Sequence, residues 1–305
     1  MISPRLRWKL ARYREQLLAR LRDLLGGQPR PRVCFSCGRL VGAHEKVCSH
    51  CGASQSALSL SAFKRVALAV IPDEAPLTYA LLFANVVFFA VAAIVSLRAG
   101  SGGGIGLFDM NNEVLFLLGA KHGGSIFFLH EYWRLVMPIF LHGGLIHFLF
   151  NSFVLWQVGP QAEELFGSRR FLFLYLVTGI AGFIASAWWY DPRSISIGSS
   201  GSLFGLFGIL ISYISQQAGF ASEYRASLIR WAVFMLIIGL FLGADNAAHL
   251  GGLLSGLVLG RLVSARRPAT PAAKLRVELM AWGSAAVILW SVAMVLLHLP
   301  PAAGS

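Results

Sequence analysis

Long apolar segments separated by short polar ones are the dominant pattern along this chain. Seven of them have the composition of membrane-spanning helices, at residues 77–98, 142–158, 171–190, 200–215, 228–244, 247–264 and 278–298. A helix needs roughly 20 apolar residues to cross about 30 Å of hydrocarbon, so the shorter segments fit a membrane only where neighbouring helices bury their polar residues and glycines. The pattern predicts an all-α polytopic membrane protein whose shorter helices lie inside the bundle.

Composition and charge agree with this class. Hydrophobic residues make up 56% of the 305 residues and charged residues 13%, which is more apolar surface than a soluble core can use. The net charge is +12, and residues 1–65 supply +10 of it, with 13 Lys or Arg against three acidic residues. This asymmetry indicates a cytoplasmic N-terminus attracted to anionic lipid. Nucleic acid is not an expected partner, because the basic segment lacks interleaved aromatic residues.

Composition also divides the chain. Residues 1–28 have apolar positions three and four apart among arginines, which predicts a basic amphipathic helix that lies on the membrane surface or packs against the next module. Residues 29–56 form a cysteine-containing module and residues 57–76 a linker. Residues 77–264 form a six-helix membrane core, and residues 265–305 add a cytoplasmic loop and a seventh transmembrane helix.

All four cysteines lie in the second segment, as two CxxC pairs formed by Cys34 with Cys37 and by Cys48 with Cys51. Four thiolates on two tight turns suit a closed tetrahedral zinc site, so we expect a zinc-ribbon-like module with structural zinc. His44 and His50 are alternative ligands. Disulfides are the competing interpretation, but they rarely persist in the reducing cytosol where the basic flanks place this segment.

Polar residues at membrane depth gather at one end of the predicted bundle. The positive-inside rule makes the second, fourth and sixth spans run from outside to inside, so their starts share a depth. His142, His147 and Asn151 open the second span, Ser200 opens the fourth and His249 lies near the start of the sixth. Such residues are costly in a membrane, and their convergence marks a functional site in its outer half.

These residue types have the chemistry of nucleophilic catalysis. Ser200 lies in a Gly198-Ser-Ser-Gly201 turn at a helix start, where free backbone N–H groups can stabilise an oxyanion. His249 supplies a base, while Asp245 is expected, with Asn246, to end the tight outer loop, which leaves a dyad. Asn151 and His147 lie four residues apart on one helix face, and both side chains can donate to an oxyanion.

Two further features bear on the packing of this core. Glycines at four-residue or shorter spacing on the fourth and sixth spans favour close approach of the two helices. The long first outer loop, about residues 99–141, is too apolar for a simple linker. Its aromatic residues Phe127, Phe128, Tyr132 and Trp133 predict that it dips into the membrane interface.

Over about residues 75–264 the chain resembles the rhomboid family of intramembrane serine proteases. The resemblance is carried by Trp133-Arg134, His142, His147 with Asn151, Glu163, Phe166-Gly167, Gly198-Ser-Ser-Gly201 and Ala248-His249 followed by Gly252. It implies a six-helix core, a Ser200 and His249 dyad, and an oxyanion site from the Asn151 amide, the His147 side chain and the Ser200 backbone N–H. It also implies supporting roles for His142, Gly198, Gly201, Trp133, Arg134 and Glu163. Phe204 departs from the family pattern, because many members have a tyrosine against the catalytic histidine.

The expected function is therefore that of a serine endopeptidase which cleaves transmembrane protein substrates near the outer face of a bacterial inner membrane. No cofactor is expected for catalysis. The zinc module either recruits a cytoplasmic partner or the cytoplasmic part of a substrate, or stabilises the N-terminus. The main alternative is a non-catalytic rhomboid-like protein that binds membrane clients. A transporter fits less well, because the chain shows no inverted repeat and the polar cluster lies at one end of the bundle.

Overall fold

The computed structural model describes residues 32–33, 39–42, 45, 48–51, 74–98, 109–217, 222–266 and 268–299. The chain divides into two units, Met1–Asp73 and Glu74–Ser305. The amphipathic helix expected at residues 1–28 lies outside the described residues, as does the linker up to residue 73. In the first unit, strand β1 (Arg32–Val33) pairs with the antiparallel strand β2 (Leu40–Val41), with Arg32 opposite Val41.

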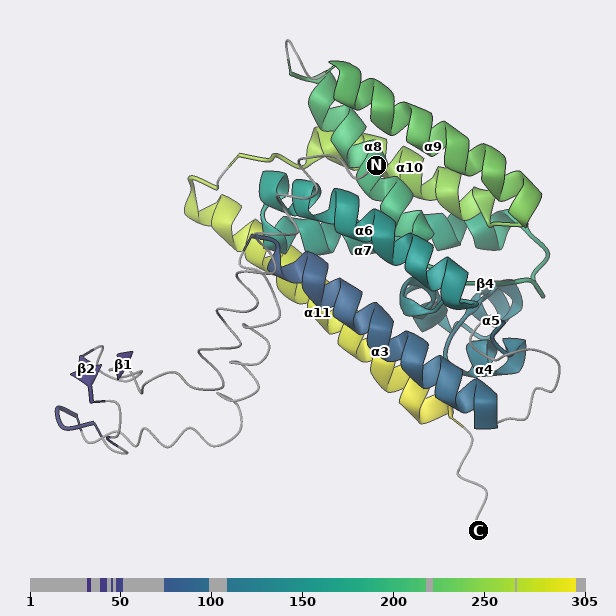
Figure 1. Cartoon of the computed structure of the whole chain (residues 1–305), viewed down its shortest axis with the longest axis horizontal. Helices are drawn as coiled ribbons and strands as arrows, with labels where there is room; N and C mark the ends of the chain where they lie inside the picture. Colours follow the sequence, from purple (N-terminus) through teal and green to yellow (C-terminus); the bar gives the residue numbers. More distant parts are fainter. Residues whose placement is uncertain are drawn as a thin grey trace, which may run out of the picture. The chain divides into compact units, whose positions relative to one another are not determined.

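Long helices in the second unit match the seven predicted segments (Figure 1). They are α3 (Pro76–Arg98), α6 (Leu145–Phe166), α7 (Ser168–Trp189), α8 (Ser200–Ser215), α9 (Ser222–Leu242), α10 (Asn246–Leu262) and α11 (Pro271–His298). The largest boundary differences are at the end of α6 and the starts of α9 and α11. Hydropathy marks only the apolar part of a helix, whereas the backbone hydrogen-bond ladder continues into its polar ends.

Among the residues that the structure describes, four helices are long and apolar enough to cross a membrane by length and composition, namely α3, α7, α9 and α11. Helix α8 is a shorter apolar helix of 16 residues, and α10 has 17 residues. The shorter helices carry the serine and histidine of the expected site. The chain is an all-α polytopic membrane protein in which these two elements need protein neighbours.

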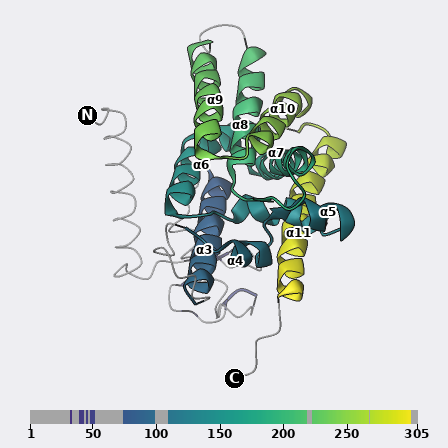
Figure 2. The same cartoon turned by 90° about the vertical axis from the view of Figure 1, so that its right-hand side faces the viewer.

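Helix α8 is the centre of the bundle. It packs against α10 over most of its length and also against α7, α9 and α6. Figure 2 shows α3 beside α6 and α11 beside α7. Helix α9 covers only one edge, and few of its side chains are buried. The placement of α8 confirms that a short, glycine-containing span lies inside the bundle.

Glycines set the close contact between α8 and α10. A Cβ atom at Gly252 would overlap the carbonyl oxygen of Gly201, and one at Gly256 would overlap the carbonyl oxygen of Gly205. Any larger side chain at these positions would force the helices apart. The structure thus confirms the close packing predicted from the glycine spacing.

The first loop contains regular structure of its own. It forms α4 (Asn112–Leu117), β3 (Lys121–His122), α5 (Gly123–Phe128) and the 3₁₀ helices η1 (Tyr132–Leu135) and η2 (Met137–Phe140). Strand β3 pairs antiparallel with β4 (Ile195–Ser196), which joins the loop to the segment before α8. Phe128 and Tyr132 are exposed, whereas Trp133 is only 1% exposed. The Trp133 ring is enclosed by the loop and α11, and the expectation that the loop dips into the membrane interface stays a prediction.

Candidate active site

Ser200 and His249 meet at the end of the bundle where α8 and α10 begin. The Ser200 Oγ lies 2.9 Å from the His249 Nε2, within hydrogen-bond range. His249 is buried and Ser200 is half-buried. At the start of α8, Leu203 N donates to Ser199 O at 3.0 Å, so the backbone N–H groups of residues 200–202 precede the helical ladder. A hydroxyl, a base and a helix N-terminus are thus brought together.

Phe204 fixes the plane of the His249 ring from one side. The two rings are stacked, with centroids 4.3 Å apart and an interplanar angle of 14°. Phe204 is itself buried, one turn along α8 from Ser200. A phenyl ring therefore provides the stacking contact at this position without a hydroxyl group.

The other ring nitrogen of His249 contacts Asn246. Its Nδ1 lies 3.0 Å from the Asn246 Oδ1, on the first residue of α10. Asp245 instead caps α10 through the Ala248 backbone N–H at 2.9 Å and accepts from the hydroxyls of Ser186 and Ser196. The prediction that Asp245 is not a catalytic partner agrees with this geometry. Sequence reasoning assigned Asn246 only to the end of the outer loop, although its position three residues before His249 places both on one helix face.

The remaining polar residues of α6 lie beside the turn that precedes Ser200. A Cβ atom at Gly198 would be 2.7 Å from the His147 Nε2 and 3.8 Å from the Asn151 Nδ2. Gly198 has a φ of +118°, which strongly favours glycine, and its N–H donates to Pro138 O at 2.8 Å. The Asn151 amide donates to the His147 carbonyl at 3.0 Å. The structure therefore brings both expected oxyanion residues to the backbone of the turn that precedes Ser200.

His142 and Glu163 support the fold at two separate places. His142 is fully buried and packs edge-on against the rings of His147 and Phe148, with centroids 5.3 and 5.5 Å away. The Glu163 carboxylate accepts from the backbone N–H groups of Leu77 and Thr78 at 3.0 and 2.7 Å, and from the Thr78 hydroxyl at 2.8 Å. It therefore caps α3, roughly 24 Å along α6 from His147 at 1.5 Å per residue, and takes no part in the site.

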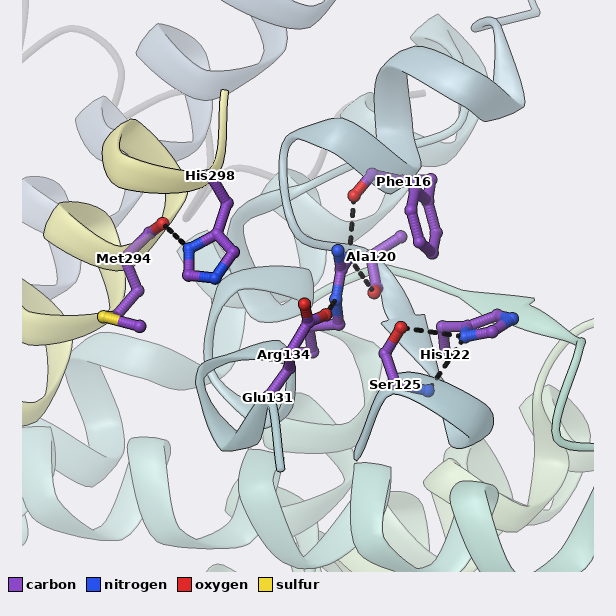
Figure 3. A network of polar contacts seen from close by, with 8 residues as sticks. All are labelled: Phe116, Ala120, His122, Ser125, Glu131, Arg134, Met294 and His298. Carbon is purple, nitrogen blue, oxygen red and sulfur yellow. Dashed lines mark hydrogen bonds and ion pairs between the residues drawn. The ribbon is translucent and has the colours of Figure 1, made fainter. Parts of the chain in front are cut away.

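Arg134 holds the first loop together, as the family resemblance implied (Figure 3). Its guanidinium donates to the carbonyls of Phe116 at 2.7 Å and Ala120 at 3.2 Å and pairs with Glu131. It also lies over the rings of Phe116 and Trp133, at 4.2 and 4.4 Å from their centroids. The Trp133 ring in turn contacts His298 at the end of α11, which links the loop to the seventh helix.

Lys121 is a buried lysine that sequence reasoning did not select. Its Nζ donates to the Ser194 hydroxyl at 3.0 Å and to the Ser194 carbonyl at 3.3 Å. Burial lowers the pKa of Lys121, and the nearby Asp245 carboxylate partly opposes that shift. Lys121 thus ties the first loop to the segment that leads into Ser200, with Asp245 supplying charge balance.

The expected zinc ligands are only partly described. Cys48 is buried and Cys51 lies three residues later in a turn, whereas Cys34 and Cys37 lie outside the described residues. The pairing of β1 with β2 brings together the two ends of the connection that carries the first CxxC pair. Within the residues that the structure describes, no group of three or more His, Cys, Asp or Glu residues is placed to hold a metal.

The fold and this arrangement define a polytopic membrane protein with a serine–histidine pair between glycine-packed helices. The family model described as Rhomboid domain matches residues 129–266, which contain every residue of that arrangement. The chain is 34% identical over 134 residues to the rhomboid protein YdcA of Bacillus subtilis (strain 168), covering 67% of that relative and 43% of this chain. The chain therefore belongs to the rhomboid family.

Two further relatives are named as family members. Rhomboid protease GluP of Bacillus subtilis (strain 168) is 39% identical over 148 residues, or 48% of this chain and 29% of that protein. RHOMBOID-like protein 1 of Arabidopsis thaliana is 36% identical over 148 residues, or 47% of this chain and 37% of that protein. The chain spans about a third to a half of the length of the first curated relatives it matches.

Proposed function

We propose that this protein is a serine endopeptidase that cleaves transmembrane protein substrates within the membrane. The observation that carries the proposal is the 2.9 Å contact between Ser200 Oγ and His249 Nε2 at the starts of two tightly packed helices. His249 accepts the hydroxyl proton as Ser200 attacks the peptide carbonyl, and returns it to the leaving amine. Water then hydrolyses the acyl-enzyme with His249 again as base.

The developing negative charge on the carbonyl oxygen needs donors that are already in place. The backbone N–H of Ser200 begins α8, and the side chains of His147 and Asn151 lie beside the preceding turn at Gly198. We propose that these three groups form the oxyanion site, in which prepositioned donors stabilise the transition state without reorganisation.

The proposed orientation follows from charge. The strongly basic N-terminal segment favours a cytoplasmic N-terminus, which places the starts of α6, α8 and α10 toward the outer leaflet. Substrates would then be cut near the outer face, and a bacterial inner membrane is the proposed location. Accessibility of single cysteines introduced at Gly143 and Ser264 in intact cells tests this orientation, and labelling of the Ser264 position from outside would refute it.

The proposed activity is tested with purified protein, a model transmembrane substrate and the Ser200→Ala variant. Wild type should cleave the substrate and react with a fluorophosphonate or chloroisocoumarin probe, whereas Ser200→Ala should do neither. Substrate binding by wild type without cleavage or probe labelling would instead show a membrane-protein binder. Equal cleavage by wild type and Ser200→Ala would refute Ser200 as nucleophile.

For the N-terminal module we propose one structural zinc ion held by Cys34, Cys37, Cys48 and Cys51. The proposal is supported by the two CxxC spacings and by the β1–β2 pairing at both ends of the first of them. Metal analysis of the full chain should find one equivalent of zinc that is lost in Cys34→Ser and Cys48→Ser. A wild-type protein that contains no zinc after purification without chelators would refute it. Binding of a cytoplasmic partner to this module is a separate question. It can be addressed by comparing the proteins pulled down by the full chain with those pulled down by the isolated membrane core.

A further inference from the structure

The side chain of Asn246 makes two hydrogen bonds that together determine its orientation. Its Nδ2 lies 3.0 Å from the Leu236 carbonyl on α9, and its Oδ1 lies 3.0 Å from the His249 Nδ1 on its own helix. A carbonyl oxygen only accepts hydrogen bonds, so the amide NH₂ group must face Leu236. The reversed amide would place two acceptor oxygens against each other. The Oδ1 is therefore the atom presented to His249.

This orientation selects one tautomer of His249. Because Oδ1 only accepts, the hydrogen bond exists only when the His249 Nδ1 carries the proton. The Nε2 is then unprotonated and faces the Ser200 hydroxyl with its lone pair, as a general base requires. In the other tautomer, an Nε2–H would face Ser200 and two lone pairs would face each other at Asn246.

We infer that Asn246 is a positioning residue that holds His249 in the base-competent tautomer, an inference that rests on the proposed protease function. During attack, the Ser200 oxygen forms a bond to the substrate carbonyl carbon, the π electrons move to the carbonyl oxygen, and the Ser200 proton passes to Nε2. The imidazolium that results keeps its Nδ1–H directed at the Asn246 Oδ1, and Asn246 gains no proton. The bond to Asn246 is stronger in this charged state than before it.

The partner of Asn246 is supplied by the least enclosed part of the bundle. Leu236 lies on α9, which covers one edge of the core and buries few side chains. Gly239, also on α9, leaves room for the amide, since a Cβ atom there would lie 2.6 Å from the Asn246 Oδ1. The orientation of the catalytic base thus depends on a contact from α9, although α9 contributes no residue to the reaction itself.

The variants Asn246→Ala and Asn246→Asp test the inference, with Asp245→Asn as the neighbouring control. Asn246→Ala should lower kcat about 10- to 100-fold, as expected for loss of a hydrogen bond to a charged group, and leave KM unchanged. Asn246→Asp keeps an acceptor at Nδ1 and should restore most of kcat. Its added negative charge should move the acidic limb of the kcat/KM profile to higher pH. Asp245→Asn keeps an acceptor for the helix cap and should leave the His249 tautomer unchanged, because Asp245 bonds to the Ala248 backbone N–H and not to the His249 ring.

A spectroscopic measurement separates this inference from the proposed function. In protein labelled with ¹⁵N-histidine, the His249 signals, assigned by their loss in His249→Ala, should show a protonated Nδ1 and an unprotonated Nε2. Asn246→Ala and Gly239→Ala should both convert this pattern to a mixture of tautomers. If wild type cleaves no substrate, the proposed function fails and the tautomer pattern still tests Asn246. The inference would be overturned if Asn246→Ala and Gly239→Ala both kept wild-type kcat and the wild-type tautomer. If Asn246→Ala does not fold, the result for Gly239→Ala decides alone.

Discussion

The substitution Gly252→Ala should separate α8 from α10 at the level of Ser200 and His249. A Cβ atom there would lie 2.8 Å from the carbonyl carbon of Gly201 and would overlap its oxygen. Carbon atoms in contact are about 3.5 to 4.0 Å apart, so α10 must move by roughly 0.7 Å or more. Gly201 directly follows Ser200, and His249 lies one turn before Gly252. The 2.9 Å contact between Ser200 and His249 would lengthen to about 3.6 Å, beyond hydrogen-bond range.

Two effects of Gly252→Ala follow from this displacement. Overpacking of a close helix contact costs about 1–3 kcal/mol of stability. A catalytic group misplaced by about 1 Å lowers the rate by up to about 100-fold. We therefore expect a lower thermal unfolding midpoint in detergent and a fall in kcat for a model transmembrane substrate, with weaker labelling of Ser200 by a fluorophosphonate probe.

Gly283→Ala on α11 is the matched control, because a Cβ atom there meets no other atom within 4 Å. The same chemical change should leave kcat and probe labelling at the wild-type level. Gly256→Ala is a second comparison, since its Cβ would overlap Gly205, about two turns away from His249. It should lower stability to a similar degree but kcat less. Wild-type kcat in Gly252→Ala, with stability equal to that of Gly283→Ala, would refute the proposed link between helix spacing and the serine–histidine contact.

Three further predictions concern single contacts. Glu163→Ala should lower the free energy of unfolding by about 2–5 kcal/mol in a chemical denaturation series, because it strands the buried donors of Thr78 at the start of α3; a change within error would refute the capping role. Phe204→Tyr should retain most of kcat, since the ring still stacks on His249. Phe204→Ala removes this stacking, so kcat should fall even at temperatures where the unfolding midpoint shows that the variant is folded. Burial, with the Arg134 and Lys121 charges, lowers the pKa of His122 below its ordinary 6.5. The unfolded chain therefore binds this proton more readily than the folded protein, and the free energy of unfolding should fall as pH drops below 6.5. The fall should be less steep in His122→Asn, which keeps the α5 cap.

Much of the helical architecture could be predicted because hydropathy is a local property. Seven apolar segments indicated seven helices, and alternating direction across a membrane placed the starts of the second, fourth and sixth at one end. That reasoning selected Ser200 and His249, which the structure brings within hydrogen-bond distance. Polar side chains are energetically unfavourable in hydrocarbon, so a serine or histidine within an apolar segment indicates a functional role from sequence alone.

Contacts between distant segments could not be predicted in the same way. Lys121 meets Ser194 across 73 residues, and β3 pairs with β4 over two residues each, a length too short to give a periodic pattern. The orientation of the Asn246 amide depends on a carbonyl of α9, which is a property of three-dimensional packing alone. The burial of Trp133 could not be predicted either, because an aromatic residue in an apolar loop looks the same in sequence whether lipid or protein surrounds it.

Because α8 and α10 are short, the contacts that stabilise this bundle are also the contacts that align the proposed catalytic residues. A helix of 16 or 17 residues with a serine or histidine at its start is a poor membrane span by itself, so its polar end must be enclosed by protein. The enclosing groups are the ones that orient the site: Phe204 on one side of His249, Asn246 on its far nitrogen, and Gly252 at the helix contact. Because the same contacts satisfy the buried polar groups and align them, a substitution that loosens the packing should reduce activity before it unfolds the protein. Comparing kcat with unfolding midpoint across the α8–α10 glycine variants measures that order directly.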